Sequence, residues 1–119
     1  TVLETLPLIE IVPKAGYRFF DYKAKYTSGA TEEICPARIP RDLGEKVETF
    51  AKRAHQALKC SVWSRSDMII RDEEIYLLET NTIPGMTENS LFPLAAKAAG
   101  LSLSALLDKM INFSLTDSR

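Results

Sequence analysis

The chain has little cysteine, no excess of positive charge and no long apolar run. Its 119 residues include two cysteines, Cys35 and Cys60, without CxxC spacing, so we expect neither a disulfide framework nor a cysteine metal cage. The formal net charge is -1, without the basic excess of most nucleic-acid-binding domains. No apolar run approaches the roughly 18 residues that a membrane span needs. These absences predict a cytoplasmic protein with reduced thiols that binds neither nucleic acid nor membrane.

The start of the chain lacks two further features. Residues 1–12 have no basic start and contain Glu4 and Glu10, which argues against a signal peptide. There is no initiator methionine, and the chain opens inside an apolar, β-prone segment. We therefore expect a piece of a longer protein, with a length that suits one compact domain and a modest core.

Apolar spacing and turn residues predict the order of the elements. The expected segments are a strand over 1–12 interrupted at Pro7, a turn over 13–16, an aromatic segment over 17–22, a loop over 23–41, a helix over 42–59, two strands over 61–71 and 74–81, and two helices over 90–99 and 102–115. Asp42 and Asn89 are the expected N-caps, and Gly100 is the expected end of the helix before it. This order predicts an α+β fold in which helices pack on one face of an antiparallel or mixed sheet.

Polar side chains gather on one face of the expected hairpin. Side chains alternate between faces along a strand, so Arg65 shares a face with Asp67, and Glu79 shares one with Asn81. A three-residue turn beginning at Asp72 would set Asp67 opposite Glu79 and Arg65 opposite Asn81, with opposed side chains starting about 5 Å apart. Two carboxylates and an amide oxygen at this density suit Mg²⁺ or Mn²⁺, and Arg65 beside them suits a phosphoryl group or an oxyanion.

The hairpin alone leaves a second interpretation open. Asp67 and Glu79 would then be solvated residues on the open face of a half-exposed sheet, because exposed charges are common in strands. The ligand interpretation gains support from the turn that follows. Gly85 and a helix start at Ser90 bring backbone N–H groups, of the kind that bind anions, close to the end of the strand.

Other polar and aromatic side chains are expected to have structural roles. His55 lies beside the apolar face of its helix, which favours a surface or structural role. Trp63 shares a strand face with Arg65 by parity, and core packing is favoured over substrate stacking. Glu32 and Glu33 are expected to form a solvated loop turn.

Three stretches of the sequence carry a resemblance to a known family. LLETNTIPGMTENSLFPLAAKAAG, residues 77–100, resembles the C-terminal signature of the D-alanine–D-alanine ligases, members of the ATP-grasp superfamily. FFDYKAKYTSGATEEICPA, residues 19–37, is similar to the mobile active-site loop of that family, and SRSDMII resembles one of its strands. The three motifs occur in the family's order over nearly the whole chain. Ser66 and Phe20 depart from the pattern, and neither is a proposed ligand.

The resemblance implies a role for each matching residue. Asp67, Glu79 and Asn81 would hold two Mg²⁺ or Mn²⁺ ions that bridge the phosphates of ATP, with Glu79 shared between them. Arg65 and the backbone N–H of Gly85 would stabilise the tetrahedral intermediate. The remaining assignments are Ser90 and the backbone of Leu91 on the carboxylate of the second D-alanine, Lys25 on the transferred phosphoryl group, and Tyr22 and Tyr26 shaping the pocket.

The resemblance also implies a function for the longer protein. It would be an ATP-dependent ligase that joins two D-alanines through an acyl phosphate for peptidoglycan synthesis, in the cytoplasm and as a homodimer. Residues 1–119 would be its single C-terminal ATP-grasp subdomain, and 20–40 its mobile active-site loop. Two alternatives stay open: a related ligase with a D-lactate or D-serine acceptor, and a folded but inactive fragment or interaction module. Tyr26 favours an amine acceptor, by resemblance only.

Overall fold

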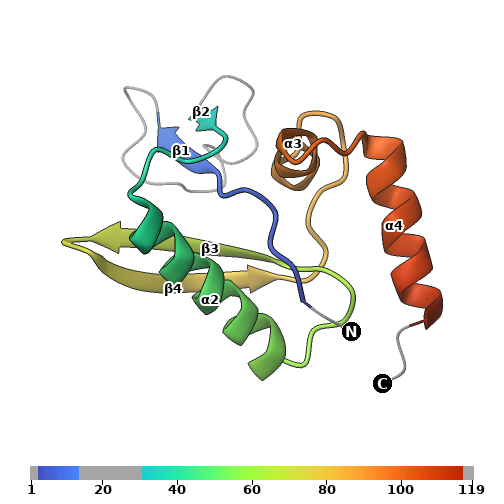
Figure 1. The fold of residues 1–119 in the computed structure, drawn as a ribbon, viewed down its shortest axis with the longest axis horizontal. Helices are drawn as coiled ribbons and strands as arrows, with labels where there is room; N and C mark the ends of the chain where they lie inside the picture. Colours follow the sequence, from blue (N-terminus) through green and yellow to red (C-terminus); the bar gives the residue numbers. More distant parts are fainter. Residues whose placement is uncertain (1–2, 14–30, 117–119) are drawn as a thin grey trace.

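The computed structural model describes residues 3–13 and 31–116 as a set of helices and short antiparallel sheets (Figure 1). The α+β class predicted from the sequence is confirmed, and both sheets are two-stranded and antiparallel. The elements are β1 (Glu10–Pro13), β2 (Thr31–Ile34), α2 (Arg41–Ala57), β3 (Arg65–Arg71), β4 (Glu74–Asn81), α3 (Leu91–Ala98) and α4 (Leu103–Thr116).

The β3–β4 hairpin pairs its residues as the sequence predicts, but through a different turn. Asp67 pairs with Glu79 and Arg65 with Asn81. The turn has two residues, Asp72 and Glu73, with φ of 51° and 66°, because the twist of a turn with two left-handed residues matches that of the strands. The predicted three-residue turn is therefore wrong. An irregularity between Asp67 and Met68 restores the predicted pairing, because β4 places an extra residue there.

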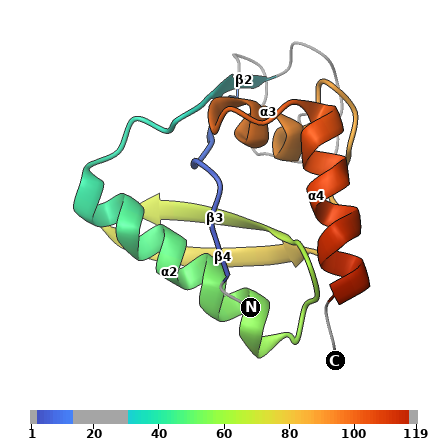
Figure 2. The same ribbon diagram turned by 45° about the vertical axis from the view of Figure 1, so that its right-hand side comes forward.

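Helix α2 covers one face of this hairpin (Figures 1 and 2). It begins one residue before the predicted start, and its N-cap is Pro40 rather than Asp42, which lies in the first turn, where a negative charge suits the helix dipole. Its predicted apolar face is only partly covered, since Phe50 is 37% exposed and Leu58 is 62% exposed. The helix ends with Lys59 in a left-handed conformation (φ 55°).

His55 joins α2 to the segment that leads into β3. Its side chain is buried, and its Nδ1 lies 2.7 Å from the hydroxyl oxygen of Ser64. Of the two roles expected for His55, surface or structural, this contact supports the structural one, because a buried imidazole needs a hydrogen-bonding partner.

Helices α3 and α4 meet in the apolar core. Ala96, Leu106 and Met110 are buried there, and Trp63 and Met86 pack against them. Core packing of Trp63 is therefore confirmed, but its predicted strand face is wrong, because β3 begins only at Arg65 and residues 61–64 are not strand. Both helices match their predicted bounds within about one residue, and α3 has Ser90 rather than Asn89 as its N-cap.

The first described residues connect the two halves of the fold. Glu4 forms an ion pair with Lys109 of α4 at 3.7 Å, Leu6 packs against the α3–α4 core, and Leu8 lies beside Gly44 of α2. The segment is a strand only over 10–13, so the predicted strand over 1–12 is too long. Pro7 has no N–H to donate to a ladder, which disfavours strand pairing at this point.

Strand β1 of the short β1–β2 sheet is joined by an exposed ion pair to the segment that follows β2. Glu32 and Glu33 are exposed, as predicted. They belong to strand β2, however, and not to the predicted loop turn. Arg38 donates to Glu10 from its backbone and from two guanidinium nitrogens, at 2.9 to 3.1 Å. These hydrogen bonds lower the pKa of the Glu10 carboxyl below its usual range.

Two expectations from composition can be compared with the described residues. Cys35 and Cys60 are free and partly buried, and burial raises the pKa of the Cys35 thiol. Within the described ranges, no single helix is both long enough and apolar enough to cross a membrane. Helices α3 and α4 reach that length and composition only together, and the chain bends by 101° between them.

Candidate functional site

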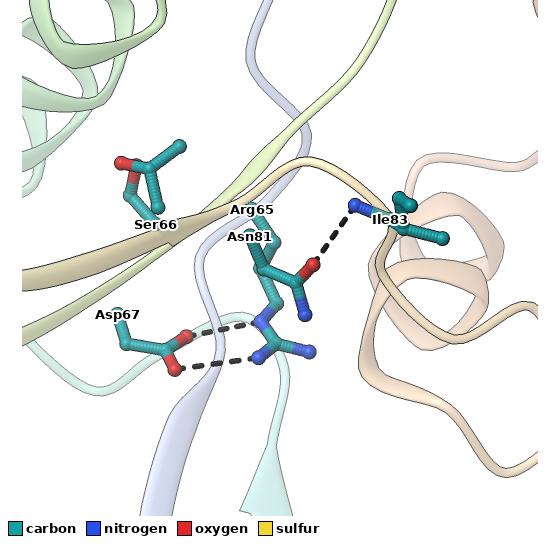
Figure 3. A network of polar contacts seen from close by, with 6 residues as sticks. Arg65, Ser66, Asp67, Asn81 and Ile83 are labelled. Atoms are coloured by element: carbon teal, nitrogen blue, oxygen red, sulfur yellow. Dashed lines mark hydrogen bonds and ion pairs between the residues drawn. The ribbon is translucent and has the colours of Figure 1, made fainter. Parts of the chain in front are cut away.

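The predicted ligands lie on the hairpin face that points away from α2. Figure 3 shows the side chains of Arg65, Asp67 and Asn81 on one side of the strands and Ser66 on the other. On the far side, the Ser66 hydroxyl oxygen lies 2.9 Å from that of Thr80. The departure from the family pattern at Ser66 therefore does not touch the proposed site.

Arg65 and Asp67 form a two-pronged ion pair. The Nε and Nη2 atoms of Arg65 donate to the two carboxylate oxygens of Asp67 at 3.0 and 3.3 Å. Both side chains are largely shielded from water, with 20% and 13% of their surface exposed. The pair places a positive charge on the carboxylate of Asp67, whose residue lies directly opposite Glu79, and so reduces the repulsion expected between the two carboxylates. Sequence reasoning set Arg65 and Asp67 on one face but did not predict this contact.

Asn81 marks the point where β4 turns toward α3. Its side-chain oxygen accepts a hydrogen bond from the backbone N–H of Ile83 at 2.8 Å (Figure 3). This bond fixes the orientation of the amide and leaves its oxygen with a second lone pair. The last strand residue thus carries an oriented amide oxygen at the end of the hairpin.

The glycine turn after β4 is anchored in the core. Pro84 is buried, and Met86 packs against the α3–α4 cluster. Gly85 lies between them, close to Ser90: a Cβ at this position would be 2.8 Å from the hydroxyl oxygen of Ser90, which would have to move. The predicted oxyanion and carboxylate residues, Gly85 and Ser90, therefore lie side by side.

Ser90 is the first residue before α3, and its hydroxyl belongs to a small network. The backbone N–H of Thr87 donates to the Ser90 hydroxyl oxygen at 3.1 Å, and the two hydroxyl oxygens lie 2.7 Å apart. The helix begins at the next residue, Leu91, and the first N–H groups of a helix have no partner within it. An anion at this end would meet a hydroxyl and backbone donors together. Thr87 lies within the motif of residues 77–100, but the motif alone predicts no role for it.

The donor set at the hairpin suits a hard cation. Asp67 and Glu79 supply carboxylates on directly opposed residues, and Asn81 supplies an amide oxygen two residues farther along β4. Oxygen ligands of this kind are those that Mg²⁺ and Mn²⁺ take. Among the described residues there is no cluster of three or more His, Cys, Asp or Glu side chains fit for a metal, and the predicted set, with two carboxylates and one amide, is of another composition.

Three predicted residues belong to the loop. Lys25, Tyr22 and Tyr26 lie outside the described residues, so their roles stay predictions. The mobility of residues 20–40 also stays a prediction. Within this range, residues 31–34 form strand β2.

Comparison with known proteins gives consistent results. A sequence model of the family described as "D-ala D-ala ligase C-terminus" matches residues 1–112. A D-alanine–D-alanine ligase from Syntrophobacter fumaroxidans is 58% identical over 115 residues, which cover 97% of this chain and 37% of that protein. Another from Desulfotalea psychrophila is 53% identical over 118 residues, with coverage of 98% and 37%. This chain therefore spans just over a third of the length of these relatives.

A solved structure agrees with the sequence matches. The D-alanine–D-alanine ligase from Bacillus anthracis complexed with ATP has a TM-score of 0.76 at 45% identity and covers 92% of this chain and 35% of its own. The VanG D-Ala:D-Ser ligase from Enterococcus faecalis has a TM-score of 0.71 at 39% identity, covering 91% and 31%.

Proposed function

Because this chain belongs to the family of the D-alanine–D-alanine ligase C-terminus, we propose that the complete protein joins two D-alanines in an ATP-dependent reaction. The observation that carries the proposal is the juxtaposition at the end of β4. Opposed carboxylates with an arginine beside them come first, and the Gly85–Ser90 turn and a helix start follow directly. This arrangement suits a reaction that handles phosphates next to a carboxylate.

The proposed chemistry has two steps. A carboxylate oxygen of the first D-alanine attacks the γ-phosphorus of ATP, which gives an acyl phosphate and ADP. The amine of the second D-alanine then attacks the acyl carbon, the C–O bond to phosphate breaks, and the amine loses a proton. Arg65 and the backbone N–H of Gly85 would stabilise the negative charge that develops on the acyl oxygen. Ser90 and the backbone N–H of Leu91 would hold the carboxylate of the second D-alanine.

The loop would act on the other side of the reacting atoms. Lys25 would reach the transferred phosphoryl group when residues 20–40 close, and Tyr22 and Tyr26 would shape the pocket. Closure would exclude water, which otherwise hydrolyses an acyl phosphate.

Asp67, Glu79 and Asn81 would hold two Mg²⁺ or Mn²⁺ ions. Bound there, the ions would neutralise phosphate charge and orient ATP. The Arg65–Asp67 ion pair is consistent with this role, because it offsets the repulsion of the carboxylates while no cation is bound.

We predict that Glu79→Gln and Asn81→Ala each remove most Mg²⁺-dependent turnover and leave the fold intact. Glu79 is exposed, so its replacement by a neutral amide of the same shape costs little packing. The measurement is ATP turnover against Mg²⁺ concentration, with thermal unfolding as the test of the fold.

Glu74→Gln is the matched control, because it removes the same charge from the same strand at the turn end of the hairpin. Its turnover should stay normal at every Mg²⁺ concentration. Near-normal turnover of Glu79→Gln at limiting Mg²⁺ would instead show that Glu79 is not a ligand.

The identity of the acceptor is tested by phosphate release from ATP by the complete protein. D-alanine, D-lactate and D-serine are supplied in separate assays, and we expect the highest kcat/KM with D-alanine. The similarity to a D-Ala:D-Ser ligase makes D-serine the second candidate. Release with none of the three would favour the inactive fragment or interaction module.

We place this reaction in the cytoplasm, where ATP is available and free cysteines such as Cys35 and Cys60 persist. Its dipeptide product would feed peptidoglycan synthesis and so the formation of the cell wall and cell shape. We further propose that the complete enzyme is a homodimer that binds neither nucleic acid nor membrane. Sedimentation analysis at several protein concentrations tests the dimer.

A further inference from the structure

We infer that Thr87 is a positioning residue, whose hydroxyl turns the proton of the Ser90 hydroxyl outward to a substrate carboxylate. The inference rests on the proposed function, in which Ser90 binds the carboxylate of the second D-alanine. It assigns a role to a side chain that touches Ser90 and not the reacting atoms.

The geometry around the Ser90 hydroxyl carries the inference. Its oxygen accepts from the backbone N–H of Thr87 at 3.1 Å and lies 2.7 Å from the Thr87 hydroxyl oxygen. Gly85 approaches it on another side, where even a Cβ would come within 2.8 Å. The Ser90 hydroxyl therefore lies against Gly85 and Thr87 of the turn, and its hydrogen bonds with Thr87 set the direction of its proton.

The two hydroxyl groups can share their hydrogen bond in two ways. If Ser90 donates to Thr87, a lone pair of the Ser90 oxygen is left to face a ligand, which repels a carboxylate. If Thr87 donates to Ser90, the Ser90 oxygen accepts two hydrogen bonds, and its own proton is available for a ligand. A carboxylate therefore selects the second arrangement, in which the Thr87 hydroxyl also polarises the Ser90 O–H group.

The fold does not need the Thr87 hydroxyl to form this turn. The backbone N–H of Ser90 donates to the carbonyl oxygen of Thr87 at 3.0 Å, and the N–H of Thr87 donates in return to the Ser90 side chain. Both bonds persist when Thr87 is replaced by another residue that keeps its backbone N–H. The Thr87 side chain is exposed, so its loss leaves no cavity in the core.

The test compares Thr87→Val with Thr87→Ser in the complete protein. Valine keeps the shape of threonine without the hydroxyl, and serine keeps the hydroxyl. Steady-state kinetics with D-alanine separate the KM of the second D-alanine from kcat. We expect Thr87→Val to raise this KM about tenfold with a much smaller change in kcat. This is the effect expected when one hydrogen bond is lost from a network that binds a charged ligand, here the substrate carboxylate. Thr87→Ser should restore the KM.

A double-mutant cycle with Ser90→Ala makes the test specific. If Thr87 acts through Ser90, Thr87→Val should raise the KM no further in the Ser90→Ala background. Thr87→Ala gives the same comparison should Thr87→Val unfold, and thermal unfolding of each variant reports the fold.

The outcomes separate this inference from the proposed function. A normal KM in Thr87→Val together with a raised KM in Ser90→Ala would overturn the role of Thr87 and leave the proposed function standing. Additive effects of the two substitutions would also overturn it. A normal KM in Ser90→Ala would overturn the assignment of Ser90 and the inference with it, and a lack of phosphate release with any D-amino acid would overturn the proposed function itself.

Discussion

Gly44, Gly85 and Gly100 differ in what their positions demand of a residue. Gly85 is favoured by contact, because a Cβ there would displace the Ser90 hydroxyl from its present position. Gly100 is required by its backbone, which has a φ of 88° and ends α3. Gly44 lies within α2, where a Cβ would be 3.8 Å from both Ile39 and Leu8, an ordinary van der Waals distance. At Gly44 neither contact nor backbone demands a glycine.

We predict that Gly44→Ala stabilises the protein by about 1 kcal/mol. Alanine lowers the conformational entropy lost on folding and is the better helix former, and its methyl group would enter the shallow hollow that Gly44 lines with Leu8 and Ile39. The measurement is the midpoint of thermal or urea unfolding of the complete protein. Gly100→Ala is the matched control and should lower stability by about 1 kcal/mol; a loss of stability in Gly44→Ala would contradict the prediction.

At the scale of single residues, the sequence predicted which of the proposed ligand side chains share a face, but not their contacts. The alternation of Arg65, Asp67, Glu79 and Asn81 predicted which side chains share a face, because that depends only on the pleat of a strand. The ion pair within β3 was not predicted, since it depends on side-chain conformation. Thr87 gained no role for the same reason.

The β3–β4 hairpin is the element that organises the site, and its turn carries a cost. Asp72 and Glu73 both adopt positive φ, which is unfavourable for residues other than glycine and, to a lesser extent, asparagine and aspartate. Glu73, with φ of 66°, has no such advantage. Arg71 pairs with Glu74 directly beside the turn. The pairing of β3 with β4 must therefore offset the conformational cost of the two turn residues.

Glu73→Gly is therefore expected to stabilise the hairpin by about 0.5–1 kcal/mol, since glycine adopts this conformation without steric strain. Hydrogen exchange of the β3 and β4 amides in the complete protein would report the change as slower exchange. Glu73→Ala removes the same charge and keeps the strain, so it should show little gain. Equal protection in the two variants would point to charge as the cause.

At the scale of elements, the sequence correctly predicted those features that depend on local residue patterns. Apolar periodicity gave α4, and Gly100 marked the end of α3, because both signals are local. Strand β2 was predicted as loop, because Thr31–Ile34 pairs with a distant segment and has two exposed glutamates. The pairing of Asp67 with Glu79 was predicted correctly from a wrong turn, since the consecutive apolar residues Ile75 to Leu78 hide the irregularity in β4.

The molecule as a whole exposes much apolar surface on the hairpin and on α4. Ile69 is 53% exposed, Tyr76 52% and Leu78 59%, and α4 carries Ile111 at 59%. Surfaces of this kind are commonly covered by another part of a protein. The chain spans just over a third of the length of its relatives, and in the function proposed here its elements would supply one side of a larger active site.

We predict that residues 1–119 alone form no D-alanyl-D-alanine and bind Mg²⁺-ATP only weakly. The sequence has no glycine-rich phosphate loop. Phosphoryl transfer depends mostly on the positioning of the phosphates, so the groups on one side of the nucleotide are insufficient for the reaction. The exposed apolar surface should also make this piece associate. Calorimetry with Mg²⁺-ATP, beside the complete protein, is the measurement. Micromolar binding by the short chain would contradict the prediction.

The irregularity at Leu78 makes the two strands of the hairpin unequal in their tolerance of deletions. Met68 pairs with Leu77 and Asp67 with Glu79, so Leu78 has no paired residue in the register of β3 and β4. A chain without Leu78 would continue directly from Leu77 to Glu79, and regular pairing would still set Glu79 opposite Asp67.

A residue lost from β3 has no such compensation. Without Ile69, and with the extra residue of β4 retained, Ser66 would take the place opposite Glu79, and the two carboxylates would move to opposite faces of the sheet. Strand β4 therefore contains one residue, before Glu79 and Asn81, that can be lost without changing their pairing. Over evolutionary time β4 can become one residue shorter and keep the two carboxylates opposed, whereas β3 cannot.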